Sequence, residues 1–363
     1  MKIIKKLSIF VALITVVFVA AIYKYNPQND DYGFSHEDSL TPPESSAENP
    51  SWWRAWQHSD SSSIPPGTII ADNITYSGTF PSDIAPSSLN NLTVSGLTRT
   101  TRLYAPDVRT ASPALLIWFH PSLNYDYTNA ETIWSTINIQ AYADSLNGDL
   151  VVAGPRSRMY MPADWDHTDA DGIWWDTTTQ DITDNYDIAF VRAVMVEAQR
   201  VYNVDPHRIY LAGFSNGGWF TYMVAMRINT RIAAFATASA GICHCPSTPS
   251  GYFHSGCTLT SAGASTCAAL QGLGGWTTCA TNCPSSNAAL PTQFPTTGYR
   301  PFGYFSHGSS DTTISPFFTC QADSDLTAAG IAHQINITAG LEHYAPTNFV
   351  NTFFPIISAY TLP

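Results

Sequence analysis

The chain has 363 residues, of which 44% are hydrophobic and 12% charged, and its formal net charge is −12. All lysines fall within residues 1–24, so the other 12 basic residues are arginines, which stand against 28 acidic residues. Such an acidic body argues against nucleic acid or anionic lipid as a partner and is compatible with a neutral substrate. The length alone allows one or two domains.

Residues 1–25 form a candidate export segment. Residues 1–6 contain three lysines, and residues 7–23 are an uncharged apolar run. A basic start followed by an apolar run of this length is typical of a signal peptide and is at the short limit for a membrane span. We expect a cleaved signal peptide and a secreted protein. The alternative is a retained anchor with the rest of the chain outside the cell, and membrane contact through this segment only.

Residues 26–66 are rich in Ser, Pro, Asp, Glu and Asn. Because this composition cannot build a hydrophobic core, we interpret the segment as a linker. Trp52, Trp53 and Trp56 interrupt it and could dock on the folded body, lie at a membrane interface or touch a polymeric substrate; docking is the simplest interpretation. Residues 67–363 are predicted to form the folded domain.

In this domain, apolar runs alternate with segments of helical periodicity. Residues 114–119 and 149–153 are apolar enough for buried strands, whereas residues 184–201 carry apolar side chains at helical spacing. Strands that alternate with helices predict an α/β fold, in which a mostly parallel sheet has helices on both faces. The other expected elements are a strand pair in 91–106, strands at 209–212, 233–239, 301–306 and 334–338, and helices after 215, near 325–332 and near 347–354, with an insert at 242–297.

Residues 213–217 fit the pattern G-x-S-x-G between an apolar strand and a helix with little charge. In this pattern the Ser lies on a tight strand-to-helix turn, where only glycines at the flanking positions avoid clashes. The turn exposes the hydroxyl and points the helix N-terminus at the reacting centre. We therefore predict that Ser215 is a nucleophile.

A serine nucleophile needs a base, and the base needs a third group that holds its tautomer. In the α/β-hydrolase arrangement the acid and then the His follow the Ser, each after a later strand. Asp311 follows the strand expected at 301–306, and His343 follows the strand expected at 334–338. The sequence thus predicts a triad of Ser215, Asp311 and His343. The competitors have less suitable positions: His207 and His333 precede strands, Glu342 adjoins His343, Asp323 and Asp325 suit a helix start, and His307 suits a packing or hydrogen-bonding role.

An oxyanion hole should use the backbone N–H of Asn216, which follows the nucleophile. A second N–H should come from the loop after the strand at 114–119. Because Pro121 has no N–H, the candidate donor is Ser122 or Leu123.

The seven cysteines all lie after residue 240. In an exported chain they indicate disulfides, although their odd number leaves one without an intramolecular partner. A zinc site built from Cys243, His244, Cys245, Cys279 and Cys283 is the alternative. The sequons at Asn73, Asn91 and Asn336 are compatible with glycosylation.

Residues 88–363 resemble the secreted serine esterases of the poly(3-hydroxybutyrate) depolymerase-like group and carbohydrate esterase family 1, which includes feruloyl and acetylxylan esterases. The resemblance rests on residues 96–106, 204–218, 233–241, 307–311 and 340–343, which match the family's motifs in order. It implies an α/β-hydrolase fold and an esterase activity without a cofactor. The chain departs from the family at His120-Pro121, where a His-Gly is usual, and in its longer, Cys-rich insert.

The resemblance also places Trp174 and Trp175 where relatives have an aromatic loop near the site. There they could stack on an aromatic acyl group or a polymer, and core packing is the alternative. The nearby acidic run of Asp164, Asp166, Asp169 and Asp171 lacks the closing Glu of a calcium loop. We therefore predict no metal site.

These features together predict an exported serine esterase that works through an acyl-enzyme. Feruloyl or acetyl esters linked to polysaccharide are the expected substrates, and an aliphatic polyester is the alternative. A catalytically inactive binding protein with the same fold is a hypothesis of another class. A serine peptidase of this fold is a weaker one.

Overall fold

The computed structural model describes residues 74–82, 88–122, 133–157, 173–177, 182, 184–241, 257, 259–282, 298–343, 345 and 349–363. All of them belong to one compact unit, residues 48–363. Several features predicted from the sequence lie outside the described residues: the export segment, the linker with its tryptophans, Asn73, Leu123, the acidic run at 164–171, Cys243, His244, Cys245 and Cys283.

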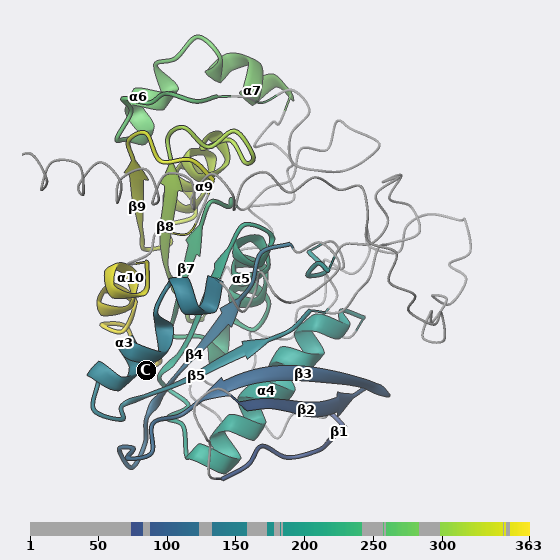
Figure 1. Ribbon diagram of the computed structural model, residues 1–363. Coiled ribbons are helices and arrows are strands. Elements are labelled where there is room, and N and C mark those ends of the chain that lie inside the picture. Colours follow the sequence, from purple (N-terminus) through teal and green to yellow (C-terminus); the bar gives the residue numbers. More distant parts are fainter. Residues whose placement is uncertain are drawn as a thin grey trace, which may run out of the picture. The chain divides into compact units, whose positions relative to one another are not determined.

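The described strands form one nine-stranded sheet in the order β1-β2-β3-β5-β4-β6-β7-β8-β9 (Figure 1). Neighbours from β5 to β9 pair in parallel, whereas β1, β2 and β3 pair antiparallel at one edge. The strands are β1 Tyr76–Ser77, β2 Ser88–Val94, β3 Leu97–Tyr104, β4 Ala114–Phe119, β5 Leu150–Pro155, β6 Ile209–Phe214, β7 Ala234–Ala238, β8 Phe302–Gly308 and β9 His333–Thr338. The mostly parallel sheet predicted from the sequence is confirmed.

The strand order creates a switch point between β4 and β6. After β4 the chain crosses to β5 on one side and then returns to β6 on the other side. In open parallel sheets, ligands bind beyond the carboxyl ends of the strands at such a point. The loops after β4 and β6 are therefore the natural place for a site.

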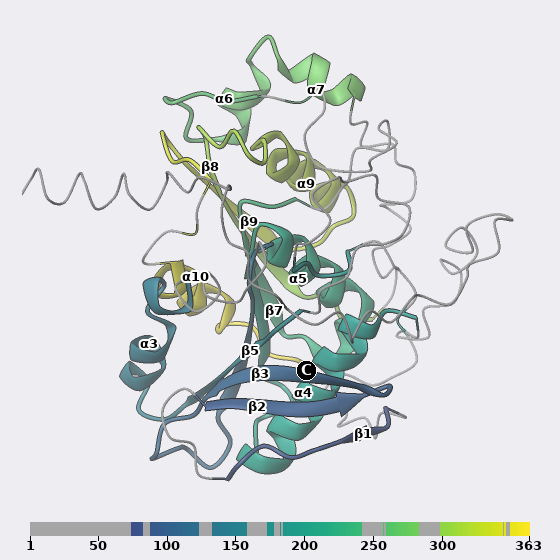
Figure 2. The same ribbon diagram turned by 45° about the vertical axis from the view of Figure 1, so that its right-hand side comes forward.

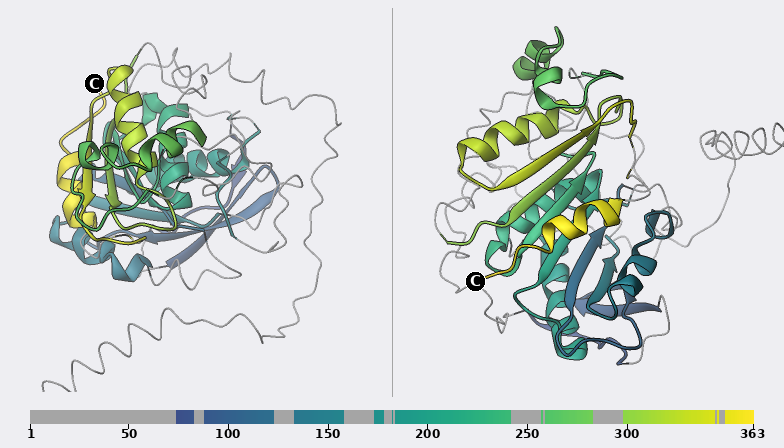
Figure 3. Two further views of the ribbon diagram at one scale, coloured as in Figure 1. Left: turned by 90° about the horizontal axis from the view of Figure 1, so that it is seen from above. Right: turned by 90° about the vertical axis from the view of Figure 1, so that its left-hand side faces the viewer.

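Helices cover both faces of the sheet because its central strands are apolar on both sides. In β4, Leu115, Ile117 and Phe119 pack with one set of helices. The alternate residues Leu116 and Trp118 pack with the other set. The first set is α4 Tyr186–Tyr202, α5 Asn216–Arg227 and α9 Phe317–Ala328, and the second is α3 Ile139–Ser145 and α10 Phe349–Ile357 (Figure 2). In the right-hand view of Figure 3, α10 crosses the near face of the sheet.

The described part of the insert contains two short helices, α6 Cys267–Gln271 and α7 Trp276–Asn282, followed by β8. A disulfide joins Cys257 to Cys279, and a second joins Cys267 to Cys320 in α9. These bonds confirm the expectation of disulfides. The zinc alternative is wrong for Cys279, because its sulfur is already bonded to another cysteine.

One predicted helix is displaced. A helix was expected near residues 325–332, but α9 starts at Phe317 and ends at Ala328. Pro316 immediately precedes it, and Gly330, with φ +66°, follows its end. Proline favours a helix start and left-handed glycine favours a helix end, so the local signals agree with the observed bounds. Asp323 and Asp325 consequently lie in the later turns of α9, and their expected place at a helix start is wrong.

Among the described residues, every helix is too short or too polar to cross a membrane.

Candidate active site

Ser215 lies between β6 and α5 in a strained turn. Its backbone has φ 56° and ψ −125°, a conformation that residues other than Gly rarely adopt. The turn needs two glycines: a Cβ on Gly213 would lie 2.3 Å from the Gly217 carbonyl oxygen, and a Cβ on Gly217 would lie 2.3 Å from the carbonyl oxygens of Phe119 and His120. The same contacts show that the end of β4 lies directly against the first turn of α5.

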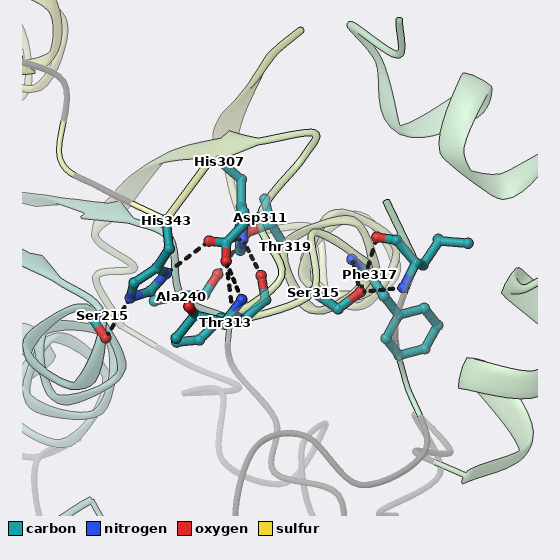
Figure 4. A network of polar contacts seen from close by, with 11 residues as sticks. Ser215, Ala240, His307, Asp311, Thr313, Ser315, Phe317, Thr319 and His343 are labelled. Carbon is teal, nitrogen blue, oxygen red and sulfur yellow. Dashed lines mark hydrogen bonds and ion pairs between the residues drawn. The ribbon is translucent and has the colours of Figure 1, made fainter. Parts of the chain in front are cut away.

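Three residues that are distant in the sequence form one hydrogen-bonded chain (Figure 4). His343 Nε2 lies 3.1 Å from Ser215 Oγ, and His343 Nδ1 lies 2.8 Å from Asp311 Oδ2. Both distances are within the range that proton transfer and tautomer control require. The structure thus brings together the three side chains that the sequence selects as a triad. Their catalytic roles stay a prediction.

The loops that carry Asp311 and His343 are tied to each other by backbone contacts. The N–H of Ser309 donates to Thr338, and the N–H of Ser310 donates to Leu341. A Cβ on Gly308 would lie 2.2 Å from the carbonyl oxygen of Leu341. The close pairing of β8 and β9 therefore fixes the separation of the acid and the imidazole.

Asp311 is fully buried and is surrounded by donors. Its Oδ1 accepts the backbone N–H groups of Thr313 and Ile314 at 2.9 and 2.8 Å. Burial alone would raise the pKa of this carboxyl, but hydrogen bonds and charge from His307 and His343 outweigh burial and hold the pKa well below its usual range. The group is a carboxylate throughout the neutral range.

His343 also contacts an aromatic ring. Phe214 occupies the first x position of the pattern G-x-S-x-G, and its ring lies 5.0 Å from the His343 ring between centroids, with the planes at 35°. Phe214 is buried. It therefore limits how far the imidazole can turn away from Ser215, a role that the motif itself does not reveal.

The candidate oxyanion donors lie on either side of the switch point. Asn216 is the first residue of α5, so its backbone N–H belongs to the first turn and has no acceptor within the helix. Ser122 follows β4. The turn before it is held by His120, whose Nδ1 contacts the Pro121 carbonyl oxygen at 2.6 Å and whose Nε2 accepts the N–H of Ser157 at 3.1 Å. Whether Ser122 donates to an oxyanion stays a prediction.

Trp175 connects the two sides of this site. Its indole N–H donates to the His120 carbonyl oxygen at 2.9 Å, and its backbone N–H donates to Asn216 Oδ1 at 2.8 Å. The ring is 1% exposed and packs on Phe119 and Phe220. Of the two roles considered from the sequence, this burial supports core packing, and the expected substrate contact of Trp175 is not what the structure favours.

Trp174 differs from its neighbour. Its side chain is half-buried and packs beside the cluster that joins the insert to α9. A substrate-binding role for Trp174 stays a prediction.

The competing residues lie elsewhere or have other partners. His333 Nε2 contacts Asp323 at 2.9 Å, and His207 Nδ1 contacts the Leu362 carbonyl oxygen at 3.1 Å. Glu342 is exposed. His307 has the hydrogen-bonding role expected from the sequence, but one of its partners is Asp311, at 3.1 Å, and sequence position alone did not reveal this contact. Among the described residues no group of three His, Cys, Asp or Glu side chains could hold a metal ion.

Comparisons with known proteins give one match in sequence and many in structure. No protein-family model matches the chain. A bifunctional acetylxylan esterase/xylanase from Neocallimastix patriciarum is 32% identical over 145 residues, which are 40% of this chain and 18% of that protein. The chain therefore spans less than a fifth of that relative's length.

Solved structures that resemble the chain include a ferulic acid esterase and an S-formylglutathione hydrolase from Agrobacterium tumefaciens. The first is 12% identical, with a TM-score of 0.46, and covers 79% of this chain and 99% of its own. The second is 13% identical, with a TM-score of 0.49 and the same coverage of both chains.

Proposed function

We propose that this carbohydrate-esterase-like α/β-hydrolase is a serine carboxylic ester hydrolase that works through an acyl-enzyme. The observation that carries the proposal is the hydrogen-bonded chain from Ser215 through His343 to Asp311 at the carboxyl edge of the sheet. The sequence similarity to a bifunctional acetylxylan esterase/xylanase, one of whose two named activities is ester hydrolysis, supports the same reaction class.

In the first half-reaction, Ser215 Oγ attacks the ester carbonyl carbon while His343 Nε2 takes the hydroxyl proton. The negative charge that develops on the carbonyl oxygen is stabilised by the N–H groups proposed for the oxyanion hole, those of Asn216 and Ser122. The tetrahedral intermediate then collapses: the bond to the alcohol oxygen breaks, and His343 gives its proton to that oxygen. The alcohol leaves, and Ser215 carries the acyl group.

In the second half-reaction, water replaces the alcohol. His343 takes a proton from the water, whose oxygen attacks the acyl carbon, and the proton returns to Ser215 Oγ as the acid leaves. Asp311 stays a carboxylate in both halves. Its Oδ2 accepts a hydrogen bond from the Nδ1–H of His343, which keeps Nε2 free to act as a base and stabilises the imidazolium when it forms.

Acetyl or feruloyl esters linked to polysaccharide are the proposed substrates, on the strength of the bifunctional acetylxylan esterase/xylanase relative and the motif resemblance. We also propose that the protein is exported. Its disulfides Cys257–Cys279 and Cys267–Cys320 support an oxidising compartment.

The test is a set of rate assays with p-nitrophenyl acetate, methyl ferulate, acetylated xylan and a poly(3-hydroxybutyrate) suspension. Ser215→Ala should lower kcat on every active substrate by about 10⁴-fold or more. Ser145→Ala, at an exposed serine of α3, is the matched control and should retain full activity. A fluorophosphonate probe should label the wild type at Ser215 and should not label Ser215→Ala.

Each outcome has a clear meaning. Ester hydrolysis that survives in Ser215→Ala would overturn the nucleophile assignment. A folded wild type that hydrolyses none of the four substrates would favour the inactive binding protein. Clearing of the polyester without release of acetate or ferulate would replace the proposed substrate class.

A further inference from the structure

His307 is a buried histidine in contact with the carboxylate of the proposed triad. It lies in β8, its side chain is 0% exposed, and it is four residues before Asp311. Its ring nitrogens contact three groups: Nε2 is 3.1 Å from Asp311 Oδ2 and 2.9 Å from the Ile314 carbonyl oxygen, and Nδ1 is 2.6 Å from Thr319 Oγ1 (Figure 4). The proton positions on the ring follow from what these partners can donate.

Both partners of Nε2 are acceptors. A carbonyl oxygen such as that of Ile314 has no proton to give. Asp311 already accepts two backbone N–H groups on Oδ1 and His343 on Oδ2, which is the environment of an ionised carboxylate. Two acceptors at these distances require a proton on Nε2.

The partner of Nδ1 also acts as an acceptor. Thr319 has a single hydroxyl proton, and its Oγ1 lies 2.5 Å from the Ala240 carbonyl oxygen, which cannot donate. The hydroxyl proton therefore lies between Thr319 and Ala240. Oγ1 faces Nδ1 with a lone pair, and this contact requires a proton on Nδ1 as well.

We infer that His307 is a doubly protonated, positively charged imidazolium that serves as a positioning residue for Asp311. A buried charge needs a partner of opposite sign. The His307 imidazolium and the Asp311 carboxylate are such partners for each other. The charge of His307 holds Asp311 in place and weakens the negative field that acts on His343. The catalytic part of this inference rests on the proposed esterase function; the protonation state does not.

His120 gives an internal comparison. It is also buried, but its Nδ1 faces an acceptor, the Pro121 carbonyl oxygen, and its Nε2 faces a donor, the N–H of Ser157. One acceptor and one donor match a neutral ring. The two histidines should therefore differ in their number of ring protons although both are buried.

The first test counts ring protons in the full chain labelled with ¹⁵N-histidine. In a spectrum that correlates ring nitrogens with directly bound protons at about pH 7, His307 should give two signals and His120 one. His307→Gln and His120→Asn assign the signals. A single signal from His307 would show a neutral ring and overturn the inference.

The second test measures kcat/KM against pH for His307→Gln. Glutamine can still donate to Asp311 but has no charge. The acid limb should move to higher pH by about one unit, because Asp311 would then stabilise a protonated His343 more strongly. Loss of a charged hydrogen bond should lower kcat about 10- to 100-fold, with little change in KM. Among the described residues in hydrogen-bond contact with His307, Asp311 titrates and His343 lies beyond it; Ile314 and Thr319, and Ala240 behind Thr319, do not titrate.

Two further variants guard against a merely structural effect. Thr319→Val removes the acceptor of the Nδ1 proton while keeping the side-chain shape, so it should remove one His307 signal and move the acid limb in the same direction. His333→Gln alters the partly exposed pair with Asp323 and should leave the profile unchanged. Folded His307→Gln and Thr319→Val enzymes that both keep the wild-type profile would overturn the positioning role.

The two proposals fail separately. Two ring signals from His307 in a wild type without ester hydrolysis would support the charged state and overturn the proposed function. Normal ester hydrolysis by a wild type whose His307 gives one ring signal would support the proposed function and overturn the charged state of His307.

Discussion

Asp311 shows how a buried carboxyl group stays charged. Burial favours the protonated form, but the side chain accepts hydrogen bonds from two backbone N–H groups and lies within 3.1 Å of ring nitrogens of His307 and His343. Because these contacts lower its pKa below the ordinary value of 3.8, the ionised form stabilises the fold above about pH 4. That contribution is lost as the pH falls through the lower, folded-state value.

Replacement of this carboxylate by an amide tests its proposed role. Asp311→Asn keeps the shape but can present a donor to His343 Nδ1, which favours the wrong tautomer. We expect kcat for p-nitrophenyl acetate to fall about 10³- to 10⁴-fold, with KM changed little. Asp323→Asn is the matched control, because Asp323 also pairs with a histidine but is 39% exposed. Equal losses in both variants would contradict the assignment.

The elements were predicted where the sequence signal is local. The apolar run at 114–119 corresponds residue for residue to β4, and the strand pair in 91–106, the strand at 209–212 and the helix at 184–201 are confirmed within a few residues. The predicted bounds of α9 are wrong because Phe317, Phe318 and Cys320 pack against the insert. The first turns of this helix therefore do not show a simple pattern with one apolar face.

The site could be predicted only in part, because many of its contacts join segments that are distant in the sequence. The order Ser, Asp, His along successive strands selects three positions, and the structure brings them together. The neighbours that hold them come from distant segments: Trp175 reaches Asn216 across 41 residues, and Thr319 reaches Ala240 across 79. No local pattern encodes such contacts. The difference in burial between Trp175 and Trp174 is likewise not encoded locally. Trp175 is buried because its ring packs on Phe119 and Phe220, which come from distant segments.

At the scale of the elements, Gly217 controls the approach of α5 to β4. Gly217→Ala would place a Cβ 2.3 Å from two backbone carbonyl oxygens of the β4 loop, so the helix must shift. We expect the free energy of unfolding to fall by about 2 kcal/mol or more, with loss of ester hydrolysis. Gly263→Ala, where a Cβ meets nothing within 4 Å, should change stability by less than about 0.5 kcal/mol. Denaturant unfolding measures both, and a neutral Gly217→Ala would contradict the packing argument.

The two disulfides should contribute unequally. Cys267–Cys320 spans 53 residues and Cys257–Cys279 spans 22, so the first removes more entropy from the unfolded chain. Replacing both cysteines of a pair by Ala should cost about 2–4 kcal/mol, with the longer bridge costing about 1 kcal/mol more. Denaturant unfolding of the two double variants provides the comparison. The reverse order would show that loop closure does not set their contributions.

For the whole molecule, His120 predicts a loss of stability in mild acid. Burial lowers the pKa of His120 to about 4. The charges of Arg156 and Arg99 also lower this pKa, whereas the hydrogen bond with the Pro121 backbone raises it. The unfolded chain binds a proton near the ordinary value of 6.5 and the folded chain does not, so stability declines as the pH falls from 6.5 to about 4. The decline should be on the order of 3 kcal/mol.

His120→Asn, which does not titrate, should flatten the dependence of the unfolding free energy on pH in this window. Between about pH 7 and 8, the slope of unfolding free energy against pH should be the same in the variant and the wild type. In that range His120 is neutral in both the folded and the unfolded wild type. Denaturant unfolding at a series of pH values measures both slopes. A wild-type slope that persists in the variant would assign the acid sensitivity to another group.

The position of His343 after the outermost strand links chemistry to the timing of folding. Its partner Ser215 is 128 residues earlier, and among the described strands β9 pairs with β8 alone, at the edge of the sheet. Contacts of such long range form late and slowly, because loop closure costs entropy before any pairing compensates it. In refolding, hydrolysis should return only when this edge strand docks, so an intermediate that lacks β9 could have most of its secondary structure and still be inert.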